Sequence, residues 1–158
     1  METENSAAQD EATAIYLMKK VYLKDLSFES PNARNIFRGD APGYPNPEMR
    51  INIRVTHIKM ENHEYEVAIR LTFHAVDADN NSIFLAEVEH AGIFMLKNIP
   101  DEHLEHYLKV DCPRSLYPFA RQIIWSIIGW GSFPPMLVQN FDFDAMHKIN
   151  SEAETTDD

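Results

Sequence analysis

Residues 111–135, DCPRSLYPFARQIIWSIIGWGSFPP, contain the chain's only cysteine, both tryptophans and a long apolar run, and they decide how the rest must be arranged. Ser115 as N-cap and Pro118 in the first turn predict a helix here, and Gly129 and Gly131 predict its end. Helical spacing places one apolar stripe on this helix: Leu116, Phe119, Ala120, Ile123 and Ile127. Further apolar side chains extend it around the helix: Tyr117, Ile124, Trp125 and Ile128. Such a helix needs cover on two sides, so we expect a sheet on one side and, on the other, another subunit together with a loop rather than a ligand.

Four segments before this helix alternate apolar and polar side chains as strands do: residues 19–30, 49–58, 65–76 and 82–96. Short connections between the last three predict antiparallel hairpins, whereas residues 31–48, rich in Pro, Gly and Asn, predict a long crossover. Short helices are expected at residues 100–111, ending ahead of Pro113, and at residues 141–150. The predicted fold class is therefore α+β, a four-stranded antiparallel sheet with a long helix and short flanking helices packed on one face.

Small, polar and acidic residues make up both ends of the chain. Residues 1–13 and 151–158 are accordingly predicted to be disordered tails. Residues 14–150 contain no internal repeat and no linker long enough to separate domains, so they are expected to form one domain.

The charge of the chain limits its partners. With 25 acidic and 14 basic residues among 158, the formal net charge of -11 disfavours nucleic acid and suits a basic partner. The N-terminus lacks the features of a signal peptide, and residues 123–130 are far shorter than the ~20 apolar residues that cross a bilayer. A single cysteine fits a reducing compartment. We therefore expect a cytoplasmic protein that does not insert into membranes.

No nucleotide-binding loop, dinucleotide fingerprint or metalloprotease motif occurs in the sequence, so we expect no enzyme activity, no cofactor and no metal. Cys112 with His103 or His106 as base would suit a thiol hydrolase, but a buried structural cysteine is the stronger interpretation. Glu102, His103 and His106 would place metal ligands on one helix. Without a further ligand at a diagnostic spacing, surface histidines are the better interpretation.

Acidic side chains recur on predicted strand faces. Strict alternation in the first strand puts five residues on one face: Val21, Leu23, Asp25, Ser27 and Glu29. In the fourth strand Leu85, Glu87 and Glu89 share a face. If both are solvent faces of the sheet, they form an acidic surface with an apolar spot, suited to a basic folded partner.

Several motifs, in this order, resemble the SecB family of bacterial protein-export chaperones: YLKDLSFESPNA (22–33), FLAEVEHAGIF (84–94), CPRSLYPFAR (112–121), GSFPP (131–135) and NFD (140–142). The resemblance covers about residues 16–149. It implies a homotetramer, assembled as a dimer of dimers with helices between the dimers. It also implies an ATP-independent chaperone without enzyme activity or cofactor, which binds unfolded precursor proteins and delivers them to the SecA ATPase.

The resemblance also implies roles for individual residues. The expected SecA-docking residues are Asp25, Glu29, Leu85 and Glu87. The expected client-binding groove contains Ile36, Phe37, Tyr44, Tyr117, Trp125, Ile128 and Phe133, a set chosen partly for apolar character. Three alternatives stay open: a SecB-like chaperone dedicated to a single client such as an antitoxin, a thiol enzyme, and a purely structural oligomer.

Overall fold

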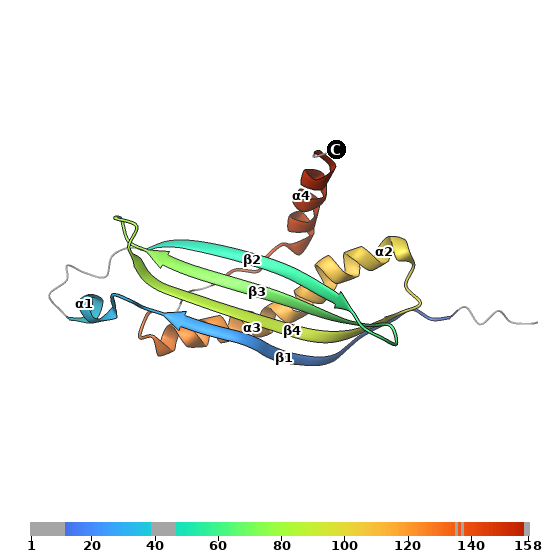
Figure 1. The fold of residues 1–158 in the computed structure, drawn as a ribbon, viewed down its shortest axis with the longest axis horizontal. Coiled ribbons are helices and arrows are strands. Elements are labelled where there is room, and N and C mark those ends of the chain that lie inside the picture. Colours follow the sequence, from blue (N-terminus) through green and yellow to red (C-terminus); the bar gives the residue numbers. More distant parts are fainter. Residues whose placement is uncertain (1–11, 39–46, 135, 137, 157–158) are drawn as a thin grey trace, which may run out of the picture.

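A four-stranded antiparallel sheet is the frame of the computed structural model, which describes residues 12–38, 47–134, 136 and 138–156. Its strands are β1 (Ile15–Glu29), β2 (Glu48–Lys59), β3 (Glu64–Val76) and β4 (Ser82–Lys97). Their order across the sheet is β1-β4-β3-β2, so the crossover between β1 and β2 joins opposite edges (Figure 1). With its helices this sheet makes an α+β fold, as predicted.

The predicted hairpins are confirmed, because β2 pairs with β3 and β3 with β4 in antiparallel register. Between β3 and β4 the Asp77 carboxylate accepts hydrogen bonds from the backbone amides of Asp79 and Asn81, at 2.9 and 2.8 Å. Asn80 has a φ of 64°, a left-handed conformation that asparagine tolerates better than most residues. The two asparagines of this turn therefore suit its backbone conformation and hydrogen bonds.

One nearly continuous helical segment follows β4. It comprises α2 (Asp101–His106), a π-helical turn (Tyr107–Asp111) and α3 (Cys112–Trp130). The predictions that a helix stops before Pro113 and that Ser115 starts a new one are wrong. In the π turn the Cys112 amide bonds to the Tyr107 carbonyl, five residues back, and Pro113 follows where a helix is restarting and its missing N–H is tolerated.

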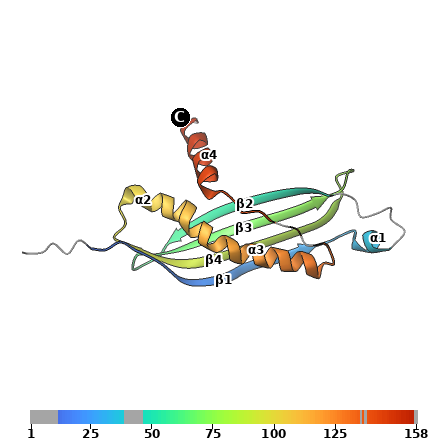
Figure 2. The ribbon, with the colours of Figure 1, turned by 180° about the vertical axis from the view of Figure 1, so that it is seen from behind.

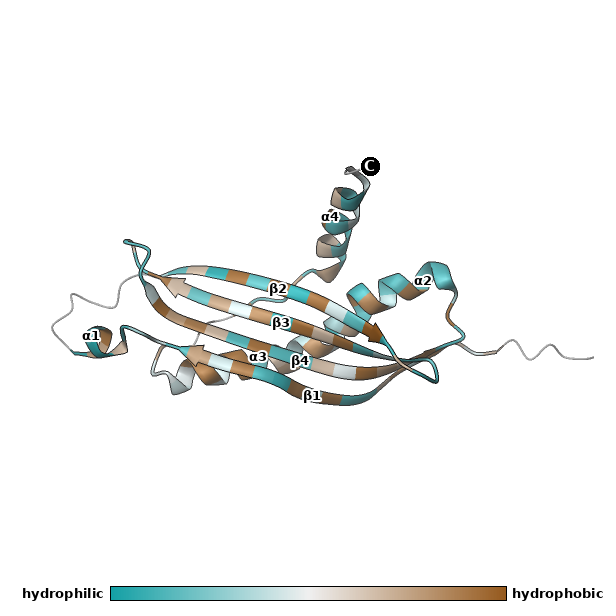
Figure 3. Cartoon of the chain, viewed as in Figure 1, coloured by the Kyte–Doolittle hydropathy of each residue, from teal (hydrophilic) through white to brown (hydrophobic). Residues whose placement is uncertain are grey.

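The core lies between α3 and the face of the sheet that we call the inner face (Figure 2). Tyr65, Val67, Ile69, Leu71 and Phe73 of β3 all point into it, as their alternation predicts, and Figure 3 shows the corresponding stripes of apolar and polar residues. From α3 the fully buried side chains include the following: Leu116, Ala120, Ile124 and Ile128.

Phe119 and Gly92 show how α3 contacts the sheet, and Phe119 departs from the predicted apolar stripe. Phe119 is 45 % exposed, because it lies beside the core rather than over it. Gly92 of β4 lies under the helix, where a Cβ atom would meet Cδ2 of Leu116 at 3.0 Å. The absence of a side chain there permits the close approach of α3 to β4.

The remaining helices do not cover the sheet as α3 does. The helix α1 (Ala33–Phe37) lies beyond the end of β1, and α4 (Phe143–Thr156) projects beside the β2 edge (Figures 1 and 2). Ile36 of α1 and Phe143 of α4 nevertheless contact the core on the same side as α3, so these helices border the inner face without covering it. The last helix also continues through residues 151–156, which were expected to be disordered, because Asn150 is followed by residues that sustain the helical turn.

Candidate functional site

The four expected docking residues lie together on the outer face of the sheet, opposite the helix. In the β1–β4 register Asp25 is opposite Glu89, Ser27 is opposite Glu87, and Glu29 is opposite Leu85. We call the acidic group formed in this way the acidic face; it consists of Asp25, Glu29, Leu85, Glu87 and Glu89. Residues from two strands distant in sequence thus form one continuous surface, as the pattern of each strand alone indicates.

Strict alternation along β1, however, is wrong. The register shifts between Met18 and Lys20 and again between Leu23 and Asp25. Leu23 consequently pairs with His90 on the inner face, whereas Asp25, two residues later, lies on the outer face. Such an irregularity inserts an extra residue and reverses the face of those that follow. The predicted face was therefore correct for Asp25 to Glu29 but not for Val21 and Leu23.

Arg70 of β3 lies at the centre of the acidic face. Its guanidinium nitrogens are 3.0 Å from a Glu89 oxygen, 3.5 Å from Asp25 and 3.9 Å from Glu87. The Thr72 hydroxyl also donates to Glu87, at 3.2 Å. Sequence reasoning missed Arg70, although its position between the inward-facing Ile69 and Leu71 indicates an outward side chain.

An aromatic cluster forms at one end of the sheet, where α1 meets the segment after α3. Phe133 is its centre, 3 % exposed, with ring centroids 4.9 Å from Phe84, 5.2 Å from Phe37 and 6.2 Å from Phe28. Phe37 is 47 % exposed and Ile36 is partly buried. Two expected groove residues therefore contact each other here, and one of them is accessible.

The other expected groove residues are distributed differently. Tyr117 and Ile128 are buried, and the Tyr117 hydroxyl donates a 2.8 Å hydrogen bond to the Gln139 carbonyl, which holds the segment after α3. Trp125 is 48 % exposed and borders a shallow pocket. Tyr44 lies outside the described residues. Among the expected residues that the structure describes, Phe37 and Trp125 offer the most accessible apolar surface.

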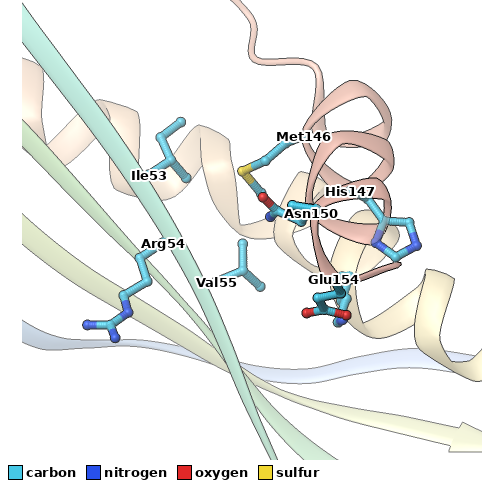
Figure 4. Close-up of a pocket in the computed structure, with 9 residues that line it drawn as sticks. Ile53, Arg54, Val55, Met146, His147, Asn150 and Glu154 are labelled. Atoms are coloured by element: carbon cyan, nitrogen blue, oxygen red, sulfur yellow. The ribbon is translucent and has the colours of Figure 1, made fainter. Parts of the chain in front are cut away.

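A further recess lies between β2 and α4 and was missed by sequence reasoning (Figure 4). It has a volume of about 450 Å³. The residues around it are Ile53, Arg54, Val55, Lys109, Met146, His147, Asn150, Ala153 and Glu154. Ile51, on the same face of β2, is 52 % exposed. The alternation of β2 contained part of the signal, because it predicts an apolar face on this strand, but it does not predict where α4 lies.

The start of α4 is attached to the long helical segment by charged side chains. Asp142 caps α4 by accepting a 3.0 Å hydrogen bond from the Ala145 amide. Asp144 contacts the guanidinium of Arg114 and lies 3.1 Å from Nε2 of His106. Both of those partners also contact Asp111. This network links α4, which forms one side of the recess beside β2, to the long helical segment.

Cys112 does not have the properties of a nucleophile. It is completely buried, and burial raises the pKa of its thiol to about 12, so the thiolate is scarce at neutral pH. His103 is exposed on α2, and His106 is engaged with Asp111 and Asp144. The arrangement opposes a thiol mechanism.

Two further properties of the described residues concern metal binding and membrane crossing. No group of three or more His, Cys, Asp or Glu side chains in this part of the chain is arranged to hold a metal ion. Across the same residues, no helix has the length and apolar character needed to cross a membrane.

Comparison with known proteins agrees with this architecture. The family model described as preprotein translocase subunit SecB matches residues 8–154. Protein-export protein SecB of Magnetococcus marinus is 35 % identical, over 91 % of this chain and 89 % of its own length. The Desulfotalea psychrophila protein of the same name is 39 % identical, over 90 % and 88 %.

A solved structure shares the fold. The Mycobacterium tuberculosis SecB-like chaperone, in complex with a ChAD peptide from the HigA1 antitoxin, has a TM-score of 0.66 to this chain. The match covers 80 % of this chain and 91 % of that chain at 14 % sequence identity. Identity this low supports a common fold only.

Proposed function

Because this chain belongs to the SecB family of protein-export chaperones, which are not enzymes, we propose that it binds unfolded precursor proteins without ATP and delivers them to SecA. Binding would keep the precursor competent for export from the cytoplasm. The observation that carries this proposal is the separation of two unlike surfaces. Apolar surface is exposed at α1, α3 and the β2–α4 recess, whereas the acidic face occupies the outer side of the sheet.

Client capture is supported by apolar side chains that remain accessible in the folded chain. Phe37, Trp125 and Ile51 are each about half exposed and lie on different elements. Burying one such side chain against an unfolded segment contributes about 1.5–3 kcal/mol before ordering costs. Several weak contacts along one client add through multivalency, so binding requires no particular client sequence.

SecA docking is supported by the charge and accessibility of the acidic face. Asp25 and Glu29 are exposed, and Leu85 contributes apolar surface beside Glu29 and Glu87. A basic partner would gain from charge complementarity, chiefly through faster association, and from burial of the leucine. Docking and client capture then use different surfaces, so one molecule can hold a client while it meets SecA.

A homotetramer, built as a dimer of dimers, is supported by the exposed apolar side of α3. Phe119, Trp125 and Trp130 are 45, 48 and 79 % exposed in the single chain. A surface of this kind is typical of subunit contacts. Packing α3 between dimers would cover the side that the sheet leaves open.

Refolding of a slow-folding precursor tests the chaperone activity. We expect a near-stoichiometric amount of this protein, as a tetramer equivalent, to arrest spontaneous refolding with no nucleotide present. Unimpeded refolding of several unrelated precursors would contradict general export. Arrest of one client alone, such as an antitoxin, would instead favour the dedicated chaperone.

Substitutions on the acidic face test the docking assignment. We expect Asp25→Lys and Glu87→Lys to weaken SecA binding about tenfold at low salt, because each reverses a charge. Arrest of precursor refolding should remain as in the wild type. Binding is measured by titration of labelled SecA, and equal affinity of both variants and the wild type would remove the assignment.

A further inference from the structure

Arg70 is the basic group in contact with three carboxylates of the acidic face. It projects from β3 across β4 and reaches Asp25 on β1, so one guanidinium spans three strands. Its distances to the three carboxylates increase from Glu89, at 3.0 Å, through Asp25 to Glu87, at 3.9 Å. A docking surface for a basic partner thus already contains a cation of its own.

The three carboxylates differ in their access to solvent. The side chain of Glu89 is 23 % exposed and that of Glu87 31 %, whereas that of Asp25 is 56 % exposed. Glu89 therefore combines the shortest contact with Arg70 and the least access for a partner. Asp25 combines a longer contact and the greatest access. A cation that arrives from solvent meets Asp25 first and Glu89 last.

We propose that Arg70 is an intramolecular competitor for the basic groups that dock on the acidic face. This inference rests on the proposed docking function and identifies a residue that sets its affinity. In the free chain the guanidinium lies 3.5 Å from Asp25 and 3.9 Å from Glu87 and so neutralises part of the charge that would attract an incoming Lys or Arg. On docking, the partner pairs with those two carboxylates and Arg70 remains with Glu89.

Arg70 competes with an incoming cation through the arrangement of its N–H donors and through its positive charge. A guanidinium presents several N–H donors in a fixed fork, so one Arg can satisfy oxygens of neighbouring carboxylates together. A carboxylate that is already paired with Arg70 carries less unneutralised charge, so a second cation at the same group gains less attraction. Arg70 also reduces the net negative potential that draws any cation to the surface, so a partner with a single isolated positive charge gains little.

Arg54 supplies a matched control. It lies directly opposite Arg70 in the β2–β3 register, one strand further from the acidic face, and Figure 4 shows its side chain pointing away from the β2–α4 recess. Removing its charge changes the net charge of the molecule as much as removing that of Arg70. A difference between the two substitutions therefore reports the local contacts and not the total charge.

The experiment measures binding of Arg70→Gln, Arg54→Gln and wild type to an oligolysine peptide and, separately, to SecA. We expect Arg70→Gln to bind both probes about three- to tenfold more tightly at low salt, with a steeper salt dependence, and Arg54→Gln to change affinity less than twofold. Equal effects of the two substitutions, or weaker binding by Arg70→Gln, would overturn the inference. Tighter peptide binding by Arg70→Gln without any SecA binding by the wild type would sustain the competitor role and reject the docking function.

A second pair of variants tests the inference in the opposite direction and does not depend on the folding of Arg70→Gln. Glu89→Gln removes the group that retains Arg70, so the guanidinium should bind Asp25 and Glu87 more fully. We expect about three- to tenfold weaker peptide binding. Glu64→Gln removes the same charge at the far end of β3 on the same face and should change affinity less than twofold. An equal loss of peptide affinity in the two variants would mean that only the net charge matters and would contradict the proposed role of Arg70.

Discussion

His90 is buried on the inner face of β4, with 7 % of its surface exposed and its ring stacked on Phe119 at 5.9 Å between centroids. Its Nδ1 atom has no hydrogen-bond partner among the described residues. Burial lowers the pKa of this histidine below its usual value of 6.5, so the folded chain keeps the imidazole neutral. The site favours a neutral ring and opposes a protonated one.

Stability should therefore depend on pH through His90. The pKa of His90 is lower in the folded chain than its usual value of 6.5. Its neutral ring therefore contributes fully to the free energy of unfolding above pH 6.5. This contribution is lost as the pH falls further, because the unfolded chain takes up the proton first. We expect the wild type to lose stability relative to His90→Gln between pH 7 and pH 5. Urea unfolding of both proteins across this range checks it. A constant difference in free energy of unfolding would contradict the assignment.

The two glycines at the end of α3 should respond oppositely to substitution by alanine. At Gly131 a Cβ atom would lie 2.3 Å from Cζ of Phe28, within the aromatic cluster, whereas at Gly129 nothing lies within 4 Å. We expect Gly131→Ala to destabilise the fold by about 1–3 kcal/mol and Gly129→Ala to stabilise the helix by up to about 1 kcal/mol. Chemical denaturation of the two variants measures the difference, and equal effects would show that Phe28 moves aside freely.

At the scale of elements, the alternation of each central strand predicts its bounds and faces well, because β3 and β4 are buried on one side throughout. The edge strand β1 was harder to predict. Its irregularities at Lys19 and Lys24 place extra residues in the pairing, and a period of two contains no sign of them. The acidic face could be predicted only because Asp25 and Glu29 both follow the second irregularity.

The helices show what a local pattern omits. Pro113 is expected to end a helix, but it follows a π-helical turn and stands in the first turn of α3, where a proline is tolerated. A local sequence pattern does not predict such a turn. The recess beside β2 depends on where α4 is anchored, which is set by contacts of Asp144 with residues distant in sequence. The contacts of Arg70 with Asp25 and Glu89 likewise involve strands that become neighbours only in the sheet.

The anchoring network of α4 yields a prediction for this element. We expect Asp144→Asn to weaken the contacts with Arg114 and His106 and to increase hydrogen exchange of residues 143–156 about threefold or more, with little effect on the sheet. Lys148→Gln changes a charge one turn further along α4 and is the control. Equal protection in the two variants would mean that apolar contacts alone hold α4.

At the scale of the whole molecule, the single chain leaves apolar surface uncovered on two sides of α3. Phe119 stacks on the ring of His90, Leu23 is paired with His90 in the β1–β4 register, and both Phe119 and Leu23 are nearly half exposed. Trp125 lies on another part of the helix. Together these side chains support the proposed assembly.

A charged substitution at this surface tests the proposed assembly. We expect Phe119→Glu to reduce the tetramer, four chains of 18.2 kDa, to a smaller species, because the carboxylate would be buried at a contact. Ile58→Glu makes the same type of change at a residue that is 62 % exposed on β2 and should leave the mass unchanged. Light scattering coupled to size exclusion measures both masses, and an unchanged Phe119→Glu tetramer would place the contact elsewhere.

The order of strands in the sheet also governs how the chain acquires its structure during synthesis. Ile15 at the start of β1 pairs with Lys97 at the end of β4, so the first strand to leave the ribosome is the last to find its neighbour. We expect the β2–β3–β4 meander to form first, because its pairings are local, and pairing with β1 to be slower, because it joins residues far apart in the sequence. Until then β1 is an unpaired strand, and its lysines at positions 19, 20 and 24 discourage association with other nascent chains.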